Sequence, residues 1–286
     1  MENYDFAIAI RAYSKLGTDS FPGFLDKFSL LKKSFESLCV SSLGLKIKLF
    51  ILFDCQKSEE LQYVEFLKNK WFEHHKVYPH IEIRKDTNYS SFQWQYNILN
   101  HQSHSQLCVF LEDDYFLLPD CLIKIKELFD NYPQINFASP YDHLEYYTKW
   151  NQIISHDVIC HNNHIWRSVP GTTSTFFTRK SMLTECETAF KAYHEVLFFP
   201  FHATDTMMWM AITHKNAFNP LFIIKCIICH RYVAWGWFIA WILCWKQLLL
   251  KKSYNLYVPI PALGTHIVSK DLPPLIDWTR LIHDKN

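Results

Sequence analysis

The sequence predicts an α/β fold with a mostly parallel central sheet, flanked by helices, and a smaller sheet in the second half. Short apolar runs alternate with longer amphipathic stretches through the first half, as strands joined by crossover helices do. The 286 residues are 49% apolar, which is enough to fill a sizeable core. No repeat or low-complexity linker interrupts the chain, so we expect a single domain over residues 1–286.

Strands and helices alternate regularly in the first half. The expected strands are residues 6–10, 47–53, 81–84 and 107–111, and the expected helices are 24–39, 59–71 and 92–100. This repetition favours parallel strands with right-handed crossovers, whose ligands bind beyond the carboxyl ends of the strands. Asp54, the polar segment 85–88 and the acidic residues 112–114 all follow strands. We therefore expect them at that edge of the sheet.

The second half is less regular. Strands are expected over 136–139 and 174–178, separated by a polar loop over 141–167. Residues 201–214 predict a turn followed by a helix. The proline-containing tail from Pro259 is expected to run as an extended wrap over the domain surface.

The charge balance argues against a nucleic-acid ligand. The chain has 29 lysines and arginines against 28 aspartates and glutamates, so no overall field draws it to nucleic acid. Nine scattered cysteines fit reduced thiols better than a disulfide framework. The apolar run near the start is too short and its surroundings too acidic for a secretion signal. A cytoplasmic location is therefore expected.

Residues 233–245 (VAWGWFIAWILCW) form an uncharged segment between Arg231 and Lys246. This segment is shorter than the ~20 residues that a spanning helix needs. Its tryptophans, with Lys251 and Lys252 beyond them, are typical of a helix that lies in a membrane interface and gives peripheral membrane contact. A buried helix or a packing surface for a partner is the alternative, and we prefer it at this point.

Three consecutive carboxylates, Glu112, Asp113 and Asp114, follow the apolar run 107–111. Like charges at close range raise one another's pKa unless a cation neutralises them. A divalent metal is the simplest such cation, and Mg²⁺ and Mn²⁺ typically bind one or two carboxylates plus substrate phosphates. A solvated turn or a helix cap is the alternative, but the strand before the triplet favours a metal site.

The segment LCVFLEDDYFLLPDCL resembles the metal-binding Asp-x-Asp region of glycosyltransferases with the A-type fold, and NYSSFQWQYNIL is similar to the stretch before it in family-two-like members. The resemblance implies a nucleotide-sugar-binding half, here 1–118, and an acceptor-binding half, here 119–286. It makes Asp114 the ligand of Mn²⁺ or Mg²⁺, and places Glu112 and Asp113 near the nucleotide sugar. The chain departs from the pattern in having Glu112 where the motif has aspartate.

The resemblance implies two further site residues. Asp205, in HATDTMMW, corresponds to the carboxylate that inverting members use as the base for the acceptor hydroxyl. An ordinary helix N-cap explains the same aspartate equally well. His266, in PALGTHI, follows the last predicted strand, where some enzymes of this fold return a histidine to the metal or the diphosphate. A surface or core histidine is the alternative.

Other polar residues are predicted contacts of the nucleotide sugar: Arg11, Asp54, Asn88, Gln95, Asn97 and Thr173. The first two are expected at strand ends, where the resemblance implies contact with the base and ribose, although either could instead form a local salt bridge. The next three belong to a polar cluster before the acidic strand. Thr173 lies in the segment 171–174, which with Trp166 is expected to form a sugar-binding loop, since aromatic faces and short hydroxyls suit sugars.

The sequence thus predicts a metal-dependent glycosyltransferase that moves a sugar from a nucleoside diphosphate sugar to a saccharide or glycan hydroxyl, with inversion. A retaining transferase on the same fold is one alternative. A non-catalytic glycan- or partner-binding protein on a degenerate transferase scaffold, docking through residues 233–245, is the other. The sequence does not predict an oligomeric state.

Overall fold

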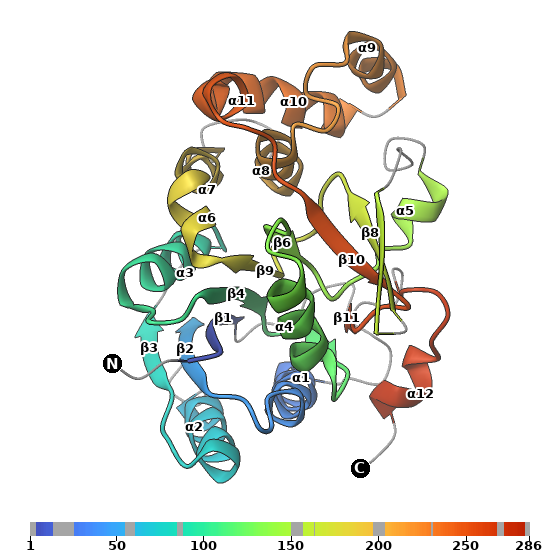
Figure 1. Cartoon of the computed structure of the whole chain (residues 1–286). Helices are drawn as coiled ribbons and strands as arrows, with labels where there is room; N and C mark the ends of the chain where they lie inside the picture. The colour runs from blue at the N-terminus through green and yellow to red at the C-terminus, as the bar shows by residue number, and fades with distance from the viewer. Residues whose placement is uncertain are drawn as a thin grey trace.

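The computed structural model describes most of the chain as a central sheet with helices on both faces (Figure 1). The described residues are 4–13, 26–54, 61–84, 88–149, 157–162, 164–196, 204–229, 231–267 and 272–283. The predicted polar residues 85–87 and the predicted turn at 201–203 lie outside these ranges.

The elements follow the predicted alternation in the first half and are more numerous than predicted in the second. In chain order they are β1 (Phe6–Tyr13), α1 (Lys27–Ser41), β2 (Ile47–Asp54), α2 (Leu61–His75), β3 (His80–Arg84), α3 (Asn88–Gln102), β4 (Leu107–Glu112), β5 (Tyr115–Leu117), α4 (Cys121–Asn131), β6 (Phe137–Ala138), α5 (Glu145–Thr148), β7 (Val158–His161), β8 (His164–Val169), β9 (Phe176–Arg179), α6 (Lys180–Glu185), α7 (Glu187–Glu195), α8 (Thr204–Thr213), α9 (Pro220–Cys229), α10 (Arg231–Leu243), α11 (Trp245–Leu250), β10 (Leu256–Ile260), β11 (Gly264–His266) and α12 (Trp278–His283).

The central sheet has nine strands in the order β3-β2-β1-β4-β9-β6-β10-β8-β7. The first four are parallel neighbours, and β6 and β10 are also parallel to each other. The antiparallel pairings make β9 and β8 run against the other strands. A separate two-stranded sheet joins β11 to β5. The predicted α/β class and mostly parallel sheet are therefore confirmed.

The predicted polar loop over 141–167 was wrong. Its described part contains the short helix α5 and the hairpin of β7 and β8, which extends the central sheet to its edge. These strands carry histidine, cysteine and arginine, so their apolar alternation is weak in the sequence. Apolar residues of this hairpin are exposed (Val158 58%, Ile165 44%), whereas Ser168 is buried, so the apolar pattern does not mark the buried face and periodicity missed the strands.

The extended wrap predicted from Pro259 was also partly wrong, because β10 enters the central sheet between β6 and β8. Its pairing with β6 covers Leu256 and Tyr257 only. Pro259 lies beyond that pairing, so its missing N–H removes no hydrogen bond on the β6 side. A proline is tolerated there for that reason.

Two apolar clusters pack on opposite faces of the sheet, because successive side chains of a strand point to opposite faces. Phe6, Ile8 and Ile10 of β1 join the cluster that contains residues of α1, α2 and α4. Ala7 and Ala9 join the cluster that contains residues of α3, α6, α7, α8 and α10. The small alanines leave room for the helices of the second layer to approach the sheet.

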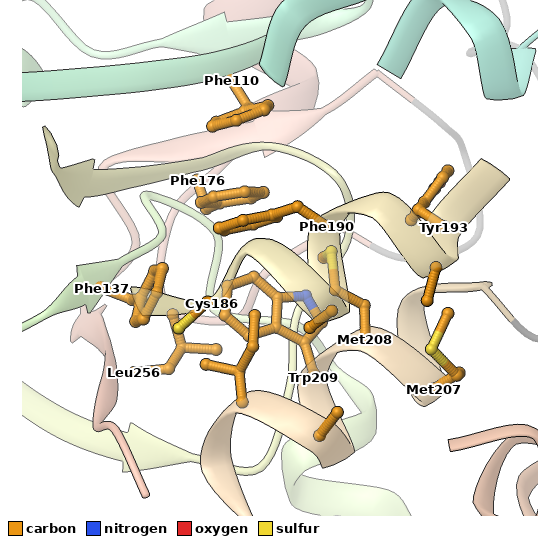
Figure 2. Packing of buried hydrophobic residues seen from close by; sticks show 14 of the residues in the cluster. Phe110, Phe137, Phe176, Cys186, Phe190, Tyr193, Met207, Met208, Trp209 and Leu256 are labelled. Carbon is orange, nitrogen blue, oxygen red and sulfur yellow. The ribbon is translucent and has the colours of Figure 1, made fainter. Parts of the chain in front are cut away.

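A stack of aromatic rings holds α7 and α8 over the sheet (Figure 2). The ring centroids of Phe110 and Phe176 are 4.5 Å apart, and those of Phe176 and Phe190 are 6.1 Å apart. Trp209 of α8 meets Phe176 edge-on with centroids 5.0 Å apart. These contacts position the start of α8 at the edge of the sheet where β4 ends.

Candidate functional site

Glu112 ends β4 and is paired with Arg11 of the neighbouring strand β1. Arg11 Nη2 donates to Glu112 Oε1 over 2.5 Å, and the two residues are register partners in the sheet. Burial alone would lower the pKa of Arg11, but the charge of Glu112 raises it well above its ordinary value. Arg11 is only 1% exposed. The structure thus places Arg11 in an internal ion pair, and its contact with a base stays a prediction.

Asp113 follows Glu112 in the turn after β4, and its side chain points into the protein. Its Oδ2 accepts from the backbone N–H of Tyr13 over 2.8 Å, and its Oδ1 accepts from Lys27 Nζ over 2.8 Å. Burial raises the pKa of Asp113, and the charge of Lys27 offsets only part of that rise. Both oxygens meet donors of the chain itself, so Asp113 ties the turn to the end of β1 and the start of α1. This placement lends no support to its predicted contact with the nucleotide sugar.

Asp114 meets His266, which β11 brings back from the far end of the chain. His266 and Tyr115 are register partners in the small sheet, and Ile267 N–H donates to the carbonyl of Asp114 over 2.7 Å. His266 Nε2 lies 2.9 Å from Asp114 Oδ2. Burial would raise the pKa of Asp114, but the charge and hydrogen bond of His266, with Lys27 and Arg11, lower it to about 2. The two predicted metal ligands are therefore side by side.

The three carboxylates thus each meet a basic side chain, in the pairs Glu112–Arg11, Asp113–Lys27 and Asp114–His266. These three basic side chains offset the repulsion for which a divalent metal was the simplest predicted remedy. Among the described residues, no three His, Cys, Asp or Glu side chains are grouped to hold a metal ion.

A different observation fits a cation at this turn. Asp114 Oδ1 is buried and has no hydrogen-bond partner among the described residues. An unpartnered buried carboxylate oxygen is costly unless a cation or donor reaches it. A carboxylate beside an imidazole suits Mn²⁺ better than Mg²⁺, which prefers oxygen ligands throughout. The remaining ligands would then come from water and a substrate phosphate.

The segment 171–175 connects this acidic turn to α8. Glu112 N–H donates to Thr175 Oγ1 over 3.1 Å. One residue earlier, Ser174 Oγ donates to Asp205 Oδ1 over 2.9 Å, and Tyr193 OH donates to the same oxygen over 3.3 Å. Asp205 is therefore oriented by two hydroxyl groups and linked to the acidic strand through adjacent residues.

Asp205 has an unusual protonation equilibrium. Burial and the nearby charge of Glu112 raise the pKa of Asp205 to about 6, against the lowering effects of Ser174 and Arg11. Asp205 is the second residue of α8, so it lies in the first turn of the helix. A helix N-terminus favours the ionised form of a carboxyl group, but at Asp205 the effect of burial outweighs that of the helix dipole. At neutral pH it is still mainly a carboxylate.

A cavity of about 180 Å³ lies beside Asp205. It is lined by both polar and apolar groups, among them Thr172, Thr173 and Trp209. Thr173 Oγ1 lies 2.5 Å from the hydroxyl of Tyr115, which directly follows the acidic triplet. The predicted sugar-binding loop thus lines a cavity and touches the acidic turn. Trp166, predicted with it, is 1% exposed and belongs to the core instead.

The predicted polar cluster on α3 does not join this site. Gln95 is fully buried, and its Nε2 donates to the carbonyls of Ala9 (2.7 Å) and Leu111 (3.0 Å). Asn97 is exposed in another hollow of the surface, with Gln93 donating to its side chain. The side chain of Asn88, which begins α3, is outside the description. A nucleotide contact of these three residues gains no support.

Asp54, the remaining predicted contact, ends β2. It is 9% exposed and is the register partner of Tyr13, at the edge of the sheet where the acidic turn lies. Its predicted contact with the base or ribose stays a prediction. Four residues of the site were not foreseen: Lys27, Tyr115, Thr175 and Tyr193. Only Tyr115, directly after the acidic triplet, had a signal in the sequence.

No protein-family model matches the chain, and no curated protein matches it in sequence. Among solved structures, S. aureus TarS 1–349 is similar with a TM-score of 0.42 and 10% identity, over 85% of this chain and 81% of that chain. A second S. aureus TarS structure has the same TM-score and identity, over 86% and 44%. The CMP:2-keto-3-deoxy-manno-octonic acid synthetase complexed with CTP has a TM-score of 0.39 and 10% identity, over 64% and 78%. Similarities of this size carry no assignment of function.

Proposed function

We propose that this protein is a glycosyltransferase of the A-type fold that transfers a sugar from a nucleoside diphosphate sugar to a saccharide or glycan hydroxyl, with inversion. One observation supports it most. A continuous arrangement links the acidic turn, through Thr175 and Ser174, to a carboxylate of raised pKa beside a cavity. Transfer of a sugar needs a base for the incoming hydroxyl and positive charge for the departing diphosphate.

Asp114 and His266 are the residues that would hold a divalent cation, with Mn²⁺ favoured over Mg²⁺. The unpartnered Asp114 Oδ1 and the adjacent imidazole support this choice. When bound, the cation would supply positive charge to the diphosphate leaving group. Arg11 of β1 is charged and pairs with Glu112, so it neutralises the negative charge at the end of β4.

Asp205 would act as the base. Ser174 and Tyr193 donate to Oδ1, so we assign proton acceptance to Oδ2. The acceptor hydroxyl oxygen forms a bond to the anomeric carbon while its proton passes to Asp205. The bond from that carbon to the diphosphate oxygen breaks, and its electron pair leaves with the nucleoside diphosphate. A carboxylate with a pKa of about 6 is a stronger base than an ordinary one and is still ionised at neutral pH.

Calorimetry with UDP and GDP sugars, with and without Mn²⁺, tests the metal role. Asp114→Asn should lose the metal-dependent part of donor binding, whereas the matched control Asp120→Asn should keep it. Asp120 precedes α4 on the surface and its side chain is 48% exposed. Donor binding by the Asp114 variant that responds to Mn²⁺ as the wild type does would reject this metal site.

A transfer assay tests the base. Asp205→Asn should bind the donor normally and lose about 10²- to 10⁴-fold in transfer rate, the usual effect of removing a general base. Product stereochemistry separates an inverting from a retaining reaction. If no nucleotide sugar binds the wild-type protein with or without metal, a glycan- or partner-binding protein on a transferase scaffold becomes the better explanation.

A further inference from the structure

Three consecutive helices, α9 to α11, present a broad apolar surface to solvent. We call it the outer face, and its members are 44–76% exposed: Leu221, Ile224, Ile227, Ile228, Phe238, Ile242, Trp245, Leu249 and Leu250. In Figure 1 these helices lie at the top of the molecule, beyond α8. A single exposed leucine is ordinary, but nine exposed apolar side chains on three consecutive helices, with α10 packed against both α9 and α11, indicate an interaction surface.

Helix α9 is apolar on both of its sides. Phe222, Ile223 and Cys226 face inward and are at most 8% exposed. Leu221 and Ile228, two turns apart on the other side, are each 76% exposed. A surface helix normally carries polar residues outward, whereas a helix that is apolar all round belongs in an apolar environment on both sides. The outer side of α9 therefore carries Lys225 as its one charged residue among exposed apolar side chains.

The charged residues that α9 to α11 and the segment after them carry all have one sign, and one acidic residue of α6, Glu185, pairs with Lys251 over 3.0 Å. The sequence contains no aspartate or glutamate between Asp205 and Asp271. The exposed charged residues of α9 to α11 and the segment after them are basic: Lys225, Arg231, Lys246, Lys251 and Lys252. Because the whole chain has a net charge of only +1, this segregation is local. It is complementary to a negatively charged surface.

We propose that the outer face docks on an anionic lipid surface. Apolar side chains of such a face enter the boundary between headgroups and acyl chains, while lysine and arginine reach the lipid phosphates. A groove of about 660 Å³ between α9 and α10, lined by Ile227, Trp235 and Phe238 together with Arg231, adds an apolar recess to this face. None of the described helices combines the length and apolarity needed to cross a bilayer, so the contact is peripheral.

A second copy of the chain is a poorer occupant. In a two-fold symmetric pair the same patch faces itself, so the basic residues of both copies would lie close together. No acidic residue on α9 to α11 offsets their repulsion, and Glu185 of α6 pairs with only one of them, Lys251. A lipid surface supplies both an apolar layer and negative charge. Docking needs neither nucleotide nor acceptor, so its test is independent of the proposed function.

Co-sedimentation with vesicles tests the apolar contribution. The wild-type protein should bind vesicles of equal parts phosphatidylcholine and phosphatidylglycerol, and bind pure phosphatidylcholine much more weakly. Leu221→Glu with Ile228→Glu should weaken binding to the anionic vesicles at least about tenfold. The matched control is Val77→Glu with Val158→Glu, which changes two apolar residues that are 52% and 58% exposed elsewhere. It should bind as the wild type does.

A second pair of variants tests the charge. Arg231→Gln with Lys246→Gln and Lys252→Gln should weaken binding on the order of 100-fold, because each cation near an anionic membrane contributes about fivefold. The control variant removes the same charge from three lysines outside the outer face: Lys46 and Lys76, which are exposed, and Lys68, whose side chain is 44% exposed. It should retain nearly wild-type binding.

Three results would overturn the proposal. One is a wild-type protein that does not bind anionic vesicles. Another is an equal weakening of vesicle binding by the outer-face variants and the control variants, since the net charge of the protein would then explain the binding. The third is a wild-type dimer that Leu221→Glu and Ile228→Glu convert to a monomer, without vesicle binding, which would assign the face to a second copy. Unfolding curves of every variant exclude a trivial loss of structure.

Discussion

Lys27→Met is the sharpest test of how the acidic turn is stabilised. Lys27 Nζ and Asp113 Oδ1 are 2.8 Å apart, and the two side chains are only 7% and 3% exposed. Methionine keeps most of the apolar length of lysine, so packing changes little. Of the two donors to Asp113, Lys27 Nζ and the N–H of Tyr13, only the second then remains, and Asp113 stays buried.

Removing one partner of a buried ion pair typically costs about 3–5 kcal/mol, because the other charge stays buried without compensation. For a chain of this size, about 2 °C of melting temperature corresponds to each kcal/mol, so we expect a loss of about 6–10 °C. Replacing both partners, in Lys27→Met with Asp113→Leu, should recover only part of this loss. The N–H of Tyr13 would lose its acceptor, which costs about 1–3 kcal/mol.

The loss should also depend on pH. Burial already raises the pKa of Asp113 above its unfolded value, and removing Lys27 raises it further. A carboxyl whose folded pKa is raised favours the fold below its unfolded pKa, and this contribution disappears as the pH rises through the folded pKa. The stability difference between wild type and variant should therefore be smaller at about pH 5 than at about pH 8.

Urea unfolding followed by tryptophan fluorescence measures both effects. Lys126→Met is the matched control, because Lys126 and Asp130 are 2.6 Å apart but 31% and 56% exposed. An exposed pair of this kind contributes at most about 1 kcal/mol. If Lys27→Met loses no more stability than the control at either pH, the buried pair does not hold the turn and the reasoning fails.

Three further predictions concern the site. Gly264→Ala should lower the free energy of unfolding by about 1–3 kcal/mol, since the new Cβ would lie 2.9 Å from Leu117 Cδ2. By shifting His266 it should also weaken Mn²⁺-dependent donor binding. Unfolding curves and calorimetry measure the two effects, and a variant that matches the wild type in both would contradict this. The transfer rate should rise with pH through about 6 and then level off, because Asp205 must lose its proton to act as a base; a rate independent of pH in this range would exclude that role. Asp205→Asn should stabilise the protein at about pH 8 but not at about pH 4. The folded pKa of Asp205 is raised, so the favourable contribution of this carboxyl group to folding stability is lost above about pH 6. Equal unfolding midpoints of variant and wild type at about pH 8 would contradict the raised pKa.

Local pattern was sufficient for the first half of the fold. The apolar runs that predict strands at 47–53 and 107–111 correspond to β2 and β4, and the helical spacing between them corresponds to α2 and α3. These elements are buried on one or both sides, so their periodicity is strong. Periodicity did not identify the edge hairpin of β7 and β8 or the strand β10, because polar residues in the hairpin and the proline in β10 interrupt the apolar pattern.

The acidic triplet at a strand exit was visible in the sequence, but its partners were not. Nothing in the local sequence distinguishes Lys27 from the other lysines of its helix or directs Asp113 inward. Gln95 looked like a ligand contact, yet its helix faces the sheet and turns it toward the carbonyls of two strands. Helix orientation about its own axis is set by packing, which a polar cluster in the sequence does not reveal.

By itself the sequence determined the order of strands and helices, the exit of an acidic segment from a buried strand, and the basic, apolar character of residues 220–252. Only the tertiary structure decided that His266 meets Asp114 and that Asp205 is tied to Glu112 through Ser174 and Thr175. It also decided which of the apolar side chains of α9 to α11 are buried and which face outward. The reason is physical. Periodicity records the faces of each element, whereas contacts between distant residues depend on strand register and on how the layers pack.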